Sequence, residues 1–426
     1  MSTGNENYIW HPFTQMKTAK APLHVVRAKD SILFTDDGKQ YIDAIASWWV
    51  NIHGHCNETI ASAIAEQAKT LEHVIFAGFT HTPAIELSKK LIGILPNNFA
   101  KVFFSDDGST SVEVALKMAI QYWHNQGHAN KTKIIAFENA YHGDTFGSMS
   151  VAERNLFNAA FDPFLFDVNR IPLPNEKNID HLKHQIAEWG DEGSTAAFIF
   201  EPLVQGAAGM LMYEPGYLDE LIAVANEKNI ICIADEVMTG FGRTGRHFAI
   251  NYLQQQPDII CLSKGITGGF MPLGVTVCTQ KIFNAFYADD ITKTFFHGHS
   301  YTANPLACAA ANASMELLVT EKCRQQIQTI NESHQQFAAS LQNNKLVKEV
   351  RQRGSILAIE IETAEATSYF NSIQTSLYEF YLTQNIFLRP LGNVVYIMPP
   401  YCITKNELDK VYTAILDSLN YLQQNI

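Results

Sequence analysis

Runs of apolar residues alternate with helical patterns from about residue 100 onward. The runs are short and rich in β-branched and aromatic residues, and they span residues 102–104, 134–137, 198–200, 230–234 and 259–262. Because a strand that is apolar at successive positions is buried on both faces, these runs indicate a mostly parallel sheet covered by helices. The pattern therefore predicts an α/β fold for this part of the chain.

Polar residues follow these apolar runs at the points where the predicted strands end. They are Ser105, Asp106, Glu138, Glu201, Asp235 and Lys264. The carboxyl ends of parallel strands share one edge of a sheet, and ligands bind at that edge. We therefore expect the chemistry of the protein to lie there.

The pattern changes after residue 313, where a helix of small residues ends. Further strand-like runs then span residues 354–361, 386–389 and 394–398. A last helix begins at Thr404, which has with Glu407 the spacing of a capping box. These elements indicate a smaller α+β domain that the N-terminal segment joins. The predicted division is residues 1–52 for the N-terminal part of the small domain, 53–315 for the large domain and 316–426 for the rest of the small domain.

Lys264 and Asp235 are the two edge residues with the most specific chemistry. A lysine at a strand end is held in a fixed position, and low dielectric keeps part of its amine unprotonated, as a Schiff base requires. A fixed aspartate can keep a pyridine nitrogen protonated. Either residue alone is more typical of a solvated strand boundary. Together with the segments below, they indicate a site for pyridoxal phosphate (PLP).

The segment Gly108, Ser109 and Thr110 is the predicted phosphate-binding site. It precedes a helix near Ser111 whose apolar residues recur on one face. Backbone amides at a helix N-terminus and nearby hydroxyls bind phosphate. Without Lys264 the same segment would be an ordinary helix cap.

Tyr141 is the predicted stacking partner of the pyridine ring. It follows the strand-like run at 134–137, and Gly143 would let the backbone approach the ring closely. A tyrosine beside a glycine is more often part of a turn, so this interpretation also depends on Lys264 and Asp235.

The segment 240–245 spells Gly-x-Gly-x-x-Gly after a predicted strand, which makes a nicotinamide enzyme a rival from another reaction class. Residues 235–239 separate the glycines from the strand, however, and no clear helix begins at Gly245. The next acid, Asp258, also comes sooner than the roughly 20 residues expected for a ribose contact. We therefore favour PLP over a dinucleotide.

Two His-Gly-His sequences, at residues 53–55 and 297–299, raise the question of a metal site. Neither has a third ligand at a fitting spacing. We therefore expect loop packing and no metal.

Composition narrows the class of protein. The chain of 426 residues has 46% hydrophobic and 17% charged residues, which is typical of a compact enzyme of two or three domains. Its formal charge of −12 disfavours binding to nucleic acid or anionic membrane. It has seven scattered cysteines, no leader-like N-terminus and no apolar stretch of roughly 18 residues. These features predict a cytoplasmic protein without a membrane span.

Taken together, these motifs resemble the class III (ω-amino) branch of the fold-type I PLP-dependent aminotransferases. The resemblance covers nearly the whole chain and rests on Gly108-Ser109, Tyr141-His142-Gly143-Asp144, Glu201-Pro202, Asp235-Glu236-Val237, the segment 240–245, Lys264-Gly265 and Asn304-Pro305-Leu306. It implies a mostly parallel seven-stranded sheet in the large domain. It also implies catalytic roles for Lys264, Asp235 and Tyr141. In the implied homodimer, Ser300 reaches the cofactor phosphate of the neighbouring subunit.

Further segments are similar to the branch of this family that converts 8-amino-7-oxononanoate to 7,8-diaminononanoate in biotin biosynthesis. They span residues 10–16, 47–49, 52–54, 80–87 and 388–390. The resemblance implies S-adenosylmethionine as the amino donor. The substrate-binding residues that it implies are Trp48, Trp49, Phe13, Tyr141, Lys264, Gly298 and Arg389.

The chemistry of such a substrate explains the choice of residues. A long aliphatic chain that ends in a carboxylate needs an apolar wall and one distant cation. Trp48 and Trp49 would supply the wall, and Arg389 would form a bidentate pair with the carboxylate. The ordinary explanations are core packing for the tryptophans and a surface ion pair for the arginine.

Three positions depart from that branch and leave alternatives open. Phe13 stands where tyrosine is usual, Leu391 where an aromatic residue is common, and Ser300 where threonine is usual. The donor remains open between S-adenosylmethionine and lysine. The remaining alternatives are another class III aminotransferase acting on an ω-amino acid, a PLP aminomutase that needs no external keto acid, and a PLP-binding protein without activity. The last is disfavoured because Lys264 and Asp235 are both present.

Overall fold

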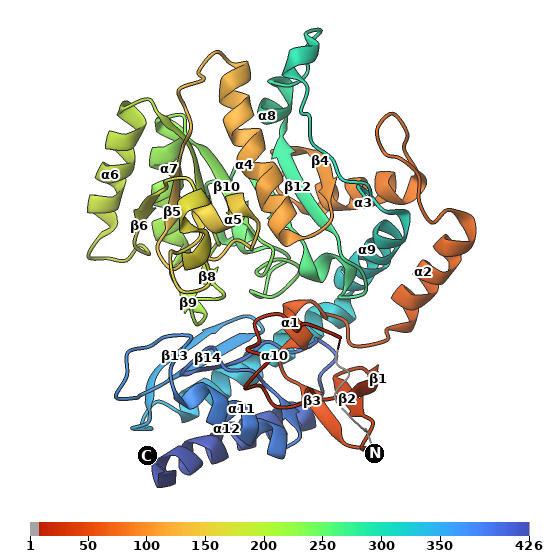
Figure 1. Ribbon diagram of the computed structural model, residues 1–426, viewed down its shortest axis with the longest axis vertical. Coiled ribbons are helices and arrows are strands. Elements are labelled where there is room, and N and C mark those ends of the chain that lie inside the picture. Colours follow the sequence, from red (N-terminus) through yellow and green to blue (C-terminus); the bar gives the residue numbers. More distant parts are fainter. Residues whose placement is uncertain (1–7, 426) are drawn as a thin grey trace.

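The computed structural model of the protein describes residues 8–425, and its largest element is a seven-stranded sheet (Figure 1). In spatial order the strands are β4 (Phe99–Ser105), β12 (Gly274–Thr279), β11 (Ile259–Leu262), β10 (Ile231–Asp235), β7 (Thr195–Phe200), β5 (Lys133–Phe137) and β6 (Asn169–Ile171). Neighbours from β11 to β6 are parallel, whereas β12 runs antiparallel to both β11 and β4. The predicted mostly parallel sheet is therefore present, with β12 reversed.

The sequence pattern misses two strands of this sheet. Strand β6 has only three residues, too few for a periodic signal. Strand β12 contains Thr276, which makes it unlike a continuous apolar run. Thr276 is nevertheless buried, because its hydroxyl donates a hydrogen bond to the backbone oxygen of Ser111 at 2.8 Å.

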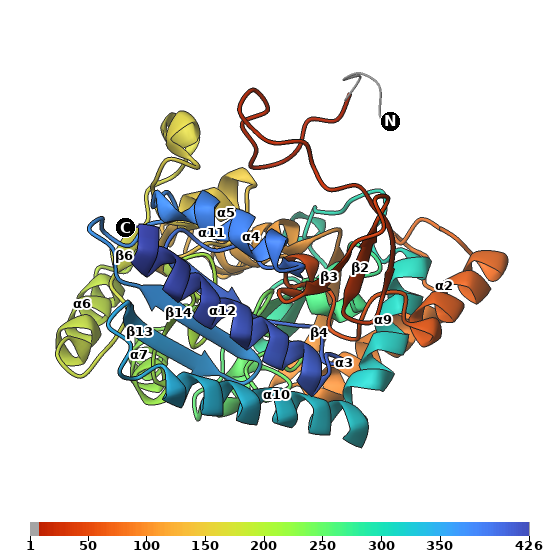
Figure 2. The same cartoon turned by 90° about the horizontal axis from the view of Figure 1, so that it is seen from below.

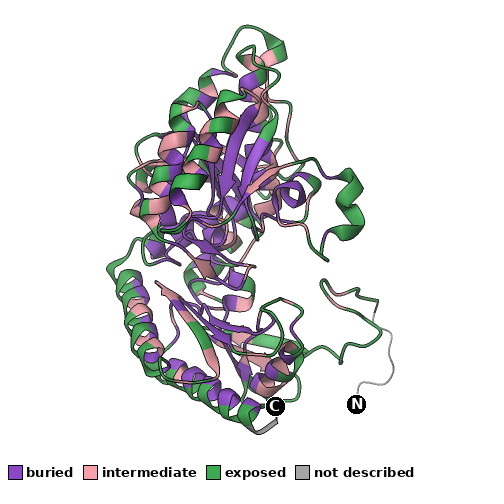
Figure 3. Ribbon diagram, turned by 90° about the vertical axis from the view of Figure 1, so that its left-hand side faces the viewer, coloured by how far each residue is buried: buried purple, intermediate pink, exposed green. Residues whose placement is uncertain are grey.

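Alternate side chains of the central strands fill two cores, one on each face of the sheet. On one face, Ile233 and neighbouring residues pack against helix α4 (Gly108–Asn125). On the other face, Phe198 belongs to the core that contains α6 (Ile179–Asp191) and α7 (Pro215–Glu227). Figure 3 shows the sheet buried between these layers. The two-residue period of a strand explains why the predicted runs are apolar throughout.

Three further helices pack together beside the seven-stranded sheet. Helix α9 (Pro305–Leu318) lies against α2 (Glu58–Thr70) and α3 (Thr82–Ile94). Asn304 caps α9, where the sequence predicts a helix of small residues, and its side chain accepts hydrogen bonds from the backbone of Leu306 and Ala307.

A second group of elements lies below the seven-stranded sheet in Figure 1. It contains an antiparallel sheet of β13 (Val347–Arg353), β14 (Ile356–Ile361) and β16 (Val394–Ile397). Its helices are α10 (Glu321–Ser340), α11 (Ile373–Thr383) and α12 (Lys405–Asn425), and Figure 2 shows α10 and α12 beside this sheet. Thr404 and Glu407 form the predicted capping box, since the backbone of each donates to the side chain of the other at 2.7 and 3.3 Å.

Segments from both ends of the chain share one sheet. The strands β1 (Val25–Lys29), β2 (Ile32–Thr35) and β3 (Gln40–Asp43) are antiparallel, and β15 (Ile386–Phe387) adds parallel to β3. A small domain built from both chain ends requires such a pairing. The boundaries at 52 and 315 stay a prediction.

Short elements connect these units. They are α1 (Ala46–Trp49), α5 (Phe146–Val151), η1 (Ala159–Phe164), β8 (Val204–Gln205), β9 (Leu211–Met212), η2 (Ala249–Tyr252), η3 (Lys264–Thr267), α8 (Gln280–Asn284) and η4 (Ile291–Lys293). Within residues 8–425, no helix is long and apolar enough to span a membrane. The expectation of no leader peptide falls on residues 1–7, which lie outside the described part of the chain.

Candidate active site

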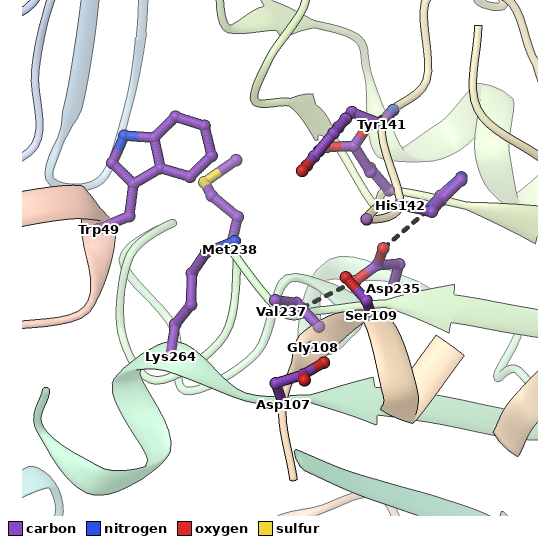
Figure 4. Close-up of a pocket in the computed structure, with 12 residues that line it drawn as sticks. Trp49, Asp107, Gly108, Ser109, Tyr141, His142, Asp235, Val237, Met238 and Lys264 are labelled. Atoms are coloured by element: carbon purple, nitrogen blue, oxygen red, sulfur yellow. Dashed lines mark hydrogen bonds and ion pairs between the residues drawn. The ribbon is translucent and has the colours of Figure 1, made fainter. Parts of the chain in front are cut away.

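A pocket lies where β10 and β11 end and helix α4 begins (Figure 4). Its lining residues are Trp49, Asp107, Gly108, Ser109, Tyr141, His142, Gly143, Glu201, Asp235, Val237, Met238 and Lys264. The carboxyl edge of the parallel strands therefore carries a site that brings together Lys264, Asp235, Tyr141, Gly108 and Ser109.

Asp235 ends β10, and two hydrogen bonds fix its carboxylate. Oδ1 accepts the Val237 N–H at 3.0 Å, and Oδ2 is bonded to Nδ1 of His142 at 2.7 Å. The residue is buried, where a carboxylate is stable only with such partners. Each carboxylate oxygen keeps a further lone pair. Asp235 can therefore accept one more N–H, such as that of a pyridinium ring.

His142 is a candidate functional residue that the sequence reasoning missed. Its Nδ1 orients Asp235, while its Nε2 is buried and has no hydrogen-bond partner in the described chain. Figure 4 shows His142 and Val237 on either side of the Asp235 carboxylate. The available signal was its place directly after Tyr141, but no sequence spacing places residue 142 beside residue 235.

Lys264 begins η3 just after β11, and its side chain extends toward Trp49 and Met238 (Figure 4). Burial lowers the pKa of its amine, while the charges of Asp235 and Glu201 raise it in part. No hydrogen bond or ion pair to any residue between 8 and 425 holds this amine; it lies 5.0 Å from the centre of a Trp49 ring. An amine with a lowered pKa and no hydrogen-bond or ion-pair partner is suited to act as a nucleophile.

The predicted phosphate-binding segment forms the first turn of α4. Asp107 is the N-cap: its side chain accepts the Thr110 N–H at 2.8 Å, and the Thr110 hydroxyl accepts the Asp107 N–H at 3.0 Å. The helix thus begins at Gly108, and the expected start near Ser111 is wrong because the first turn is polar and gives no periodic signal. Gly108 and Ser109 line the pocket, whereas the Thr110 hydroxyl is used in capping. Their role toward phosphate stays a prediction.

Two glycines let the segments that line the pocket pack closely together. A Cβ at Gly108 would lie 2.8 Å from Cγ1 of Val237. Gly143 has a φ of 126°, and a Cβ there would lie 2.2 Å from Oγ of Ser109. A larger side chain at either position would therefore force its neighbours to move. With Tyr141 for stacking, a helix N-terminus for phosphate, a buried carboxylate and a free amine, the residues present fit PLP.

Glu201 connects the Tyr141 segment to a neighbouring loop. Its Oε1 accepts the Tyr141 N–H at 3.1 Å, and its Oε2 accepts the Gly206 N–H at 2.9 Å. Burial raises the pKa of Glu201 to about 7. The Tyr141 hydroxyl donates to Asp144 at 3.0 Å, and burial raises its pKa, so the phenol stays neutral. Glu201 therefore fixes the backbone that presents Tyr141.

The two adjacent tryptophans have different surroundings. Trp49 is buried and lines the pocket, and its indole N–H donates to the Tyr396 hydroxyl at 2.9 Å. Trp48 is 44% exposed and does not line the pocket. Its neighbours are Phe13, with ring centres 5.6 Å apart, and the Arg389 guanidinium, 5.6 Å from the ring centre. The predicted substrate residues are thus divided between the pocket and this second cluster.

Gly298 and Ser300 do not lie in the pocket of the single chain. They belong to the loop between η4 and α9, and Ser300 is exposed. Nearby, Nδ1 of His297 lies 2.8 Å from the Lys117 amine. Their predicted roles in cofactor and substrate binding stay predictions.

The segment 240–245 is a loop and does not start a helix. Its Arg243 is buried and donates to the backbone oxygens of Pro399 at 2.8 Å and Trp49 at 3.1 Å. The glycines therefore serve turns around a buried arginine, an arrangement that the sequence did not indicate. Within the described residues, no group of three or more histidine, cysteine or acidic side chains is placed to hold a metal ion.

Comparison with known proteins identifies the family of this chain. The family model "Aminotransferase class-III" matches residues 14–419. The adenosylmethionine-8-amino-7-oxononanoate aminotransferase of Synechococcus elongatus is 47% identical over 97% of this chain and 98% of its own length. The crystal structure of the Methanocaldococcus jannaschii protein of the same name superposes with a TM-score of 0.91 at 37% identity, covering 96% and 97% of the two chains.

A more distant structure extends the likeness. An amine transaminase from an uncultivated Pseudomonas species, solved in a PLP-bound form, has a TM-score of 0.91 at 29% identity and covers 98% of this chain and 99% of its own. The predicted fold and the predicted PLP-dependent enzyme class are confirmed by these matches. The chain therefore belongs to the class III aminotransferases.

Proposed function

We propose that this protein transfers an amino group to 8-amino-7-oxononanoate, giving 7,8-diaminononanoate for biotin biosynthesis, with S-adenosylmethionine as the donor. The relatives named above carry this activity in their names and match almost end to end. The structural observation that supports the proposal best is the Lys264 amine, which has a lowered pKa and lies in the same pocket as the Asp235–His142 pair.

Lys264, Asp235 and Tyr141 have distinct tasks in this reaction. Bound PLP supplies a carbon that accepts the amino group and a ring that withdraws electrons from the carbon losing its proton. The Nζ of Lys264 would hold the cofactor, and as a free amine it would take the proton from the donor's amino-bearing carbon and deliver it to the carbon that receives the amino group. Asp235 keeps the ring nitrogen protonated, and Tyr141 fixes the plane of the ring. The amino group then passes to the keto acid by the reverse steps.

Arg389 is the candidate partner of the substrate carboxylate. Its guanidinium forms no ion pair with an acidic side chain of the described chain, although it is only partly exposed. A planar guanidinium with free N–H groups binds a carboxylate through two parallel hydrogen bonds. The aliphatic part of the substrate would then lie along Trp48 and Trp49.

A cytoplasmic homodimer is also part of the proposal. Ser300 and Gly298 lie outside the pocket of their own chain, on an exposed loop. A second subunit would use them if this loop reached its cofactor phosphate. A measurement of the mass of the protein in solution tests the proposed homodimer.

An absorbance titration tests the function. The purified PLP-loaded protein is mixed with S-adenosylmethionine or, separately, with lysine, and the loss of the PLP absorbance is followed. Conversion by S-adenosylmethionine that 8-amino-7-oxononanoate reverses is the expected result. Conversion by lysine alone would change the donor. A response only to β-alanine, 4-aminobutyrate or ornithine would contradict the proposal.

A further inference from the structure

Four aromatic residues and Arg389 form a closed circuit of contacts next to the Lys264 pocket. The circuit runs through Phe13, Trp48, Arg389, Tyr369 and Phe157, and we call these five residues the Arg389 cage. Ring centres are 5.6 Å apart for Phe13–Trp48, 5.9 Å for Phe13–Phe157 and 4.9 Å for Phe157–Tyr369. The guanidinium closes the circuit between Trp48 and Tyr369.

The cage exposes an unusual amount of aromatic surface. Phe13, Trp48 and Phe157 are 47%, 44% and 39% exposed, and they touch mostly through edges. Such surface costs free energy in water unless a ligand covers it. Because the cage combines aromatic rings with the cation of Arg389, the ligand that fits it best has an apolar chain and an anionic end.

The Tyr369 hydroxyl lies beside this cation and has an unused hydrogen-bond donor. Its hydroxyl oxygen lies 3.5 Å from Nη2 of Arg389, and since a guanidinium only donates, the oxygen is the acceptor. The Tyr369 hydroxyl has no acceptor for its own proton among the described residues. A carboxylate held by Arg389 would provide that acceptor.

The chain holds Tyr369 and Arg389 together by tight backbone packing. Gly392 has a φ of 63°, and a Cβ there would lie 1.6 Å from the backbone oxygen of Ser368. The side chain of Gln374 also donates to the backbone oxygen of Pro390 at 3.1 Å. The segment that carries Tyr369 is therefore held on both sides of this residue against the segment that follows Arg389.

The loop before Tyr369 has a second anchor. The Thr367 hydroxyl donates to Glu360 at 2.5 Å, and Glu360 also binds Lys348 at 2.8 Å and Arg351 at 2.6 Å. These bonds hold the pKa of Glu360 at about 2 despite its burial, so it stays an anion. The backbone two residues before Tyr369 is therefore anchored to the sheet through Glu360.

We propose that the Tyr369 hydroxyl is a second binding group for the substrate carboxylate, acting beside Arg389, and that it sets the preference for an acid over a neutral analogue. This inference rests on the proposed function and deepens it, because it names the group that recognises the acid end. In the complex, Arg389 donates two hydrogen bonds to the carboxylate and Tyr369 donates a third.

The test compares the wild type with Tyr369→Phe. The value of kcat/KM is measured for 8-amino-7-oxononanoate and for its methyl ester, which has no negative charge. We expect Tyr369→Phe to lower the value for the acid roughly fivefold and to leave the ester nearly unchanged, as expected for one lost hydrogen bond. Equal losses for acid and ester would indicate a merely structural role and would overturn the inference, as would no loss at all.

Two further variants serve as matched controls. Tyr287→Phe removes a hydroxyl from a tyrosine that is 78% exposed and lies outside the cage, and it should change neither value. Phe157→Leu removes part of the aromatic wall but no donor, so it should lower the values for acid and ester together. If Phe157→Leu lowered kcat/KM for the acid alone, the preference for the acid could not be assigned to the Tyr369 hydroxyl.

A binding measurement separates this inference from the proposed function. Calorimetric titration with octanoate and with 1-octanol probes the cage without any reaction. We expect the wild type to prefer octanoate and Tyr369→Phe to lose part of that preference. If the wild type fails to aminate the keto acid but shows this pattern, the proposed function fails and the cage stands. If the wild type showed no preference for octanoate, the proposal that the cage recognises a carboxylate would be wrong.

Discussion

The adjacent residues Trp49 and Trp48 belong to the Lys264 pocket and the Arg389 cage, respectively, yet these two sites are built in different ways. In the pocket, buried groups are fixed by hydrogen bonds, such as those of Asp235 to His142 and Val237. In the cage, half-exposed rings meet by their edges, and the polar contact of Tyr369 with Arg389 is long at 3.5 Å. This difference is what we expect if the pocket carries one fixed chemistry and the cage, as we propose, selects the substrate.

Of the substitutions that we propose, the replacement of Lys264 should lower activity most. Lys264→Ala removes the nucleophile and the proton carrier from the pocket, so kcat should fall by roughly a thousandfold or more. Steady-state turnover measures this loss, and the melting temperature shows whether the fold survives. Lys69→Ala, on the exposed face of α2, is the control. Activity near that of the wild type in Lys264→Ala would exclude the proposed mechanism.

Asp235→Asn should cost less than the loss of the lysine, but still roughly a hundredfold in kcat. The amide keeps the size of the side chain but cannot hold a positive charge on a ring nitrogen. Asp235→Glu retains the carboxylate and should recover part of the activity. If Asp235→Asn and Asp235→Glu lower kcat equally, Asp235 contributes through its geometry and not through its charge.

The cofactor part of the site could be predicted largely from the sequence, for a physical reason. A lysine and an aspartate at strand ends mark one edge of a parallel sheet, and that edge is fixed by the strand pattern itself. Lys264 and Asp235 therefore fall in one pocket without further information. The carboxylate's partner, His142, was missed because a loop brings it there, and loop paths are not encoded in periodicity.

The cage shows what the sequence could not give. Tyr369 and Phe157 lie on connections without regular structure, and their contact depends on how distant loops meet. Trp48 and Trp49 were assigned to one wall, but the irregular turn at 46–49 directs one to the cage and the other to the pocket. The missed strand β12 has a similar cause, because tertiary contacts and not composition satisfy its threonine.

Arg389→Met should separate the cage from the pocket. The substitution keeps much of the apolar volume and removes the cation, so KM for 8-amino-7-oxononanoate should rise roughly tenfold or more with a smaller change in kcat. The absorbance change with the amino donor alone should stay close to that of the wild type if the arginine serves only the keto acid. Arg324→Met, at an exposed position on α10, is the matched control. An unchanged KM would remove Arg389 from substrate binding.

The smallest expected effect is on the pH dependence of stability, to which Glu201 in the pocket should contribute. Burial raises the pKa of Glu201 from 4.5 to about 7 in the folded protein. Between these two values the folded state holds a proton that the unfolded state has released, so the free energy of unfolding falls as the pH rises. Glu201→Gln removes this titration, and its melting temperature should fall less steeply between pH 4.5 and 7 than that of the wild type. Glu188→Gln, on the exposed side of α6, should keep the wild-type slope. Equal slopes for Glu201→Gln and the wild type would show that burial does not keep Glu201 protonated in the folded pocket.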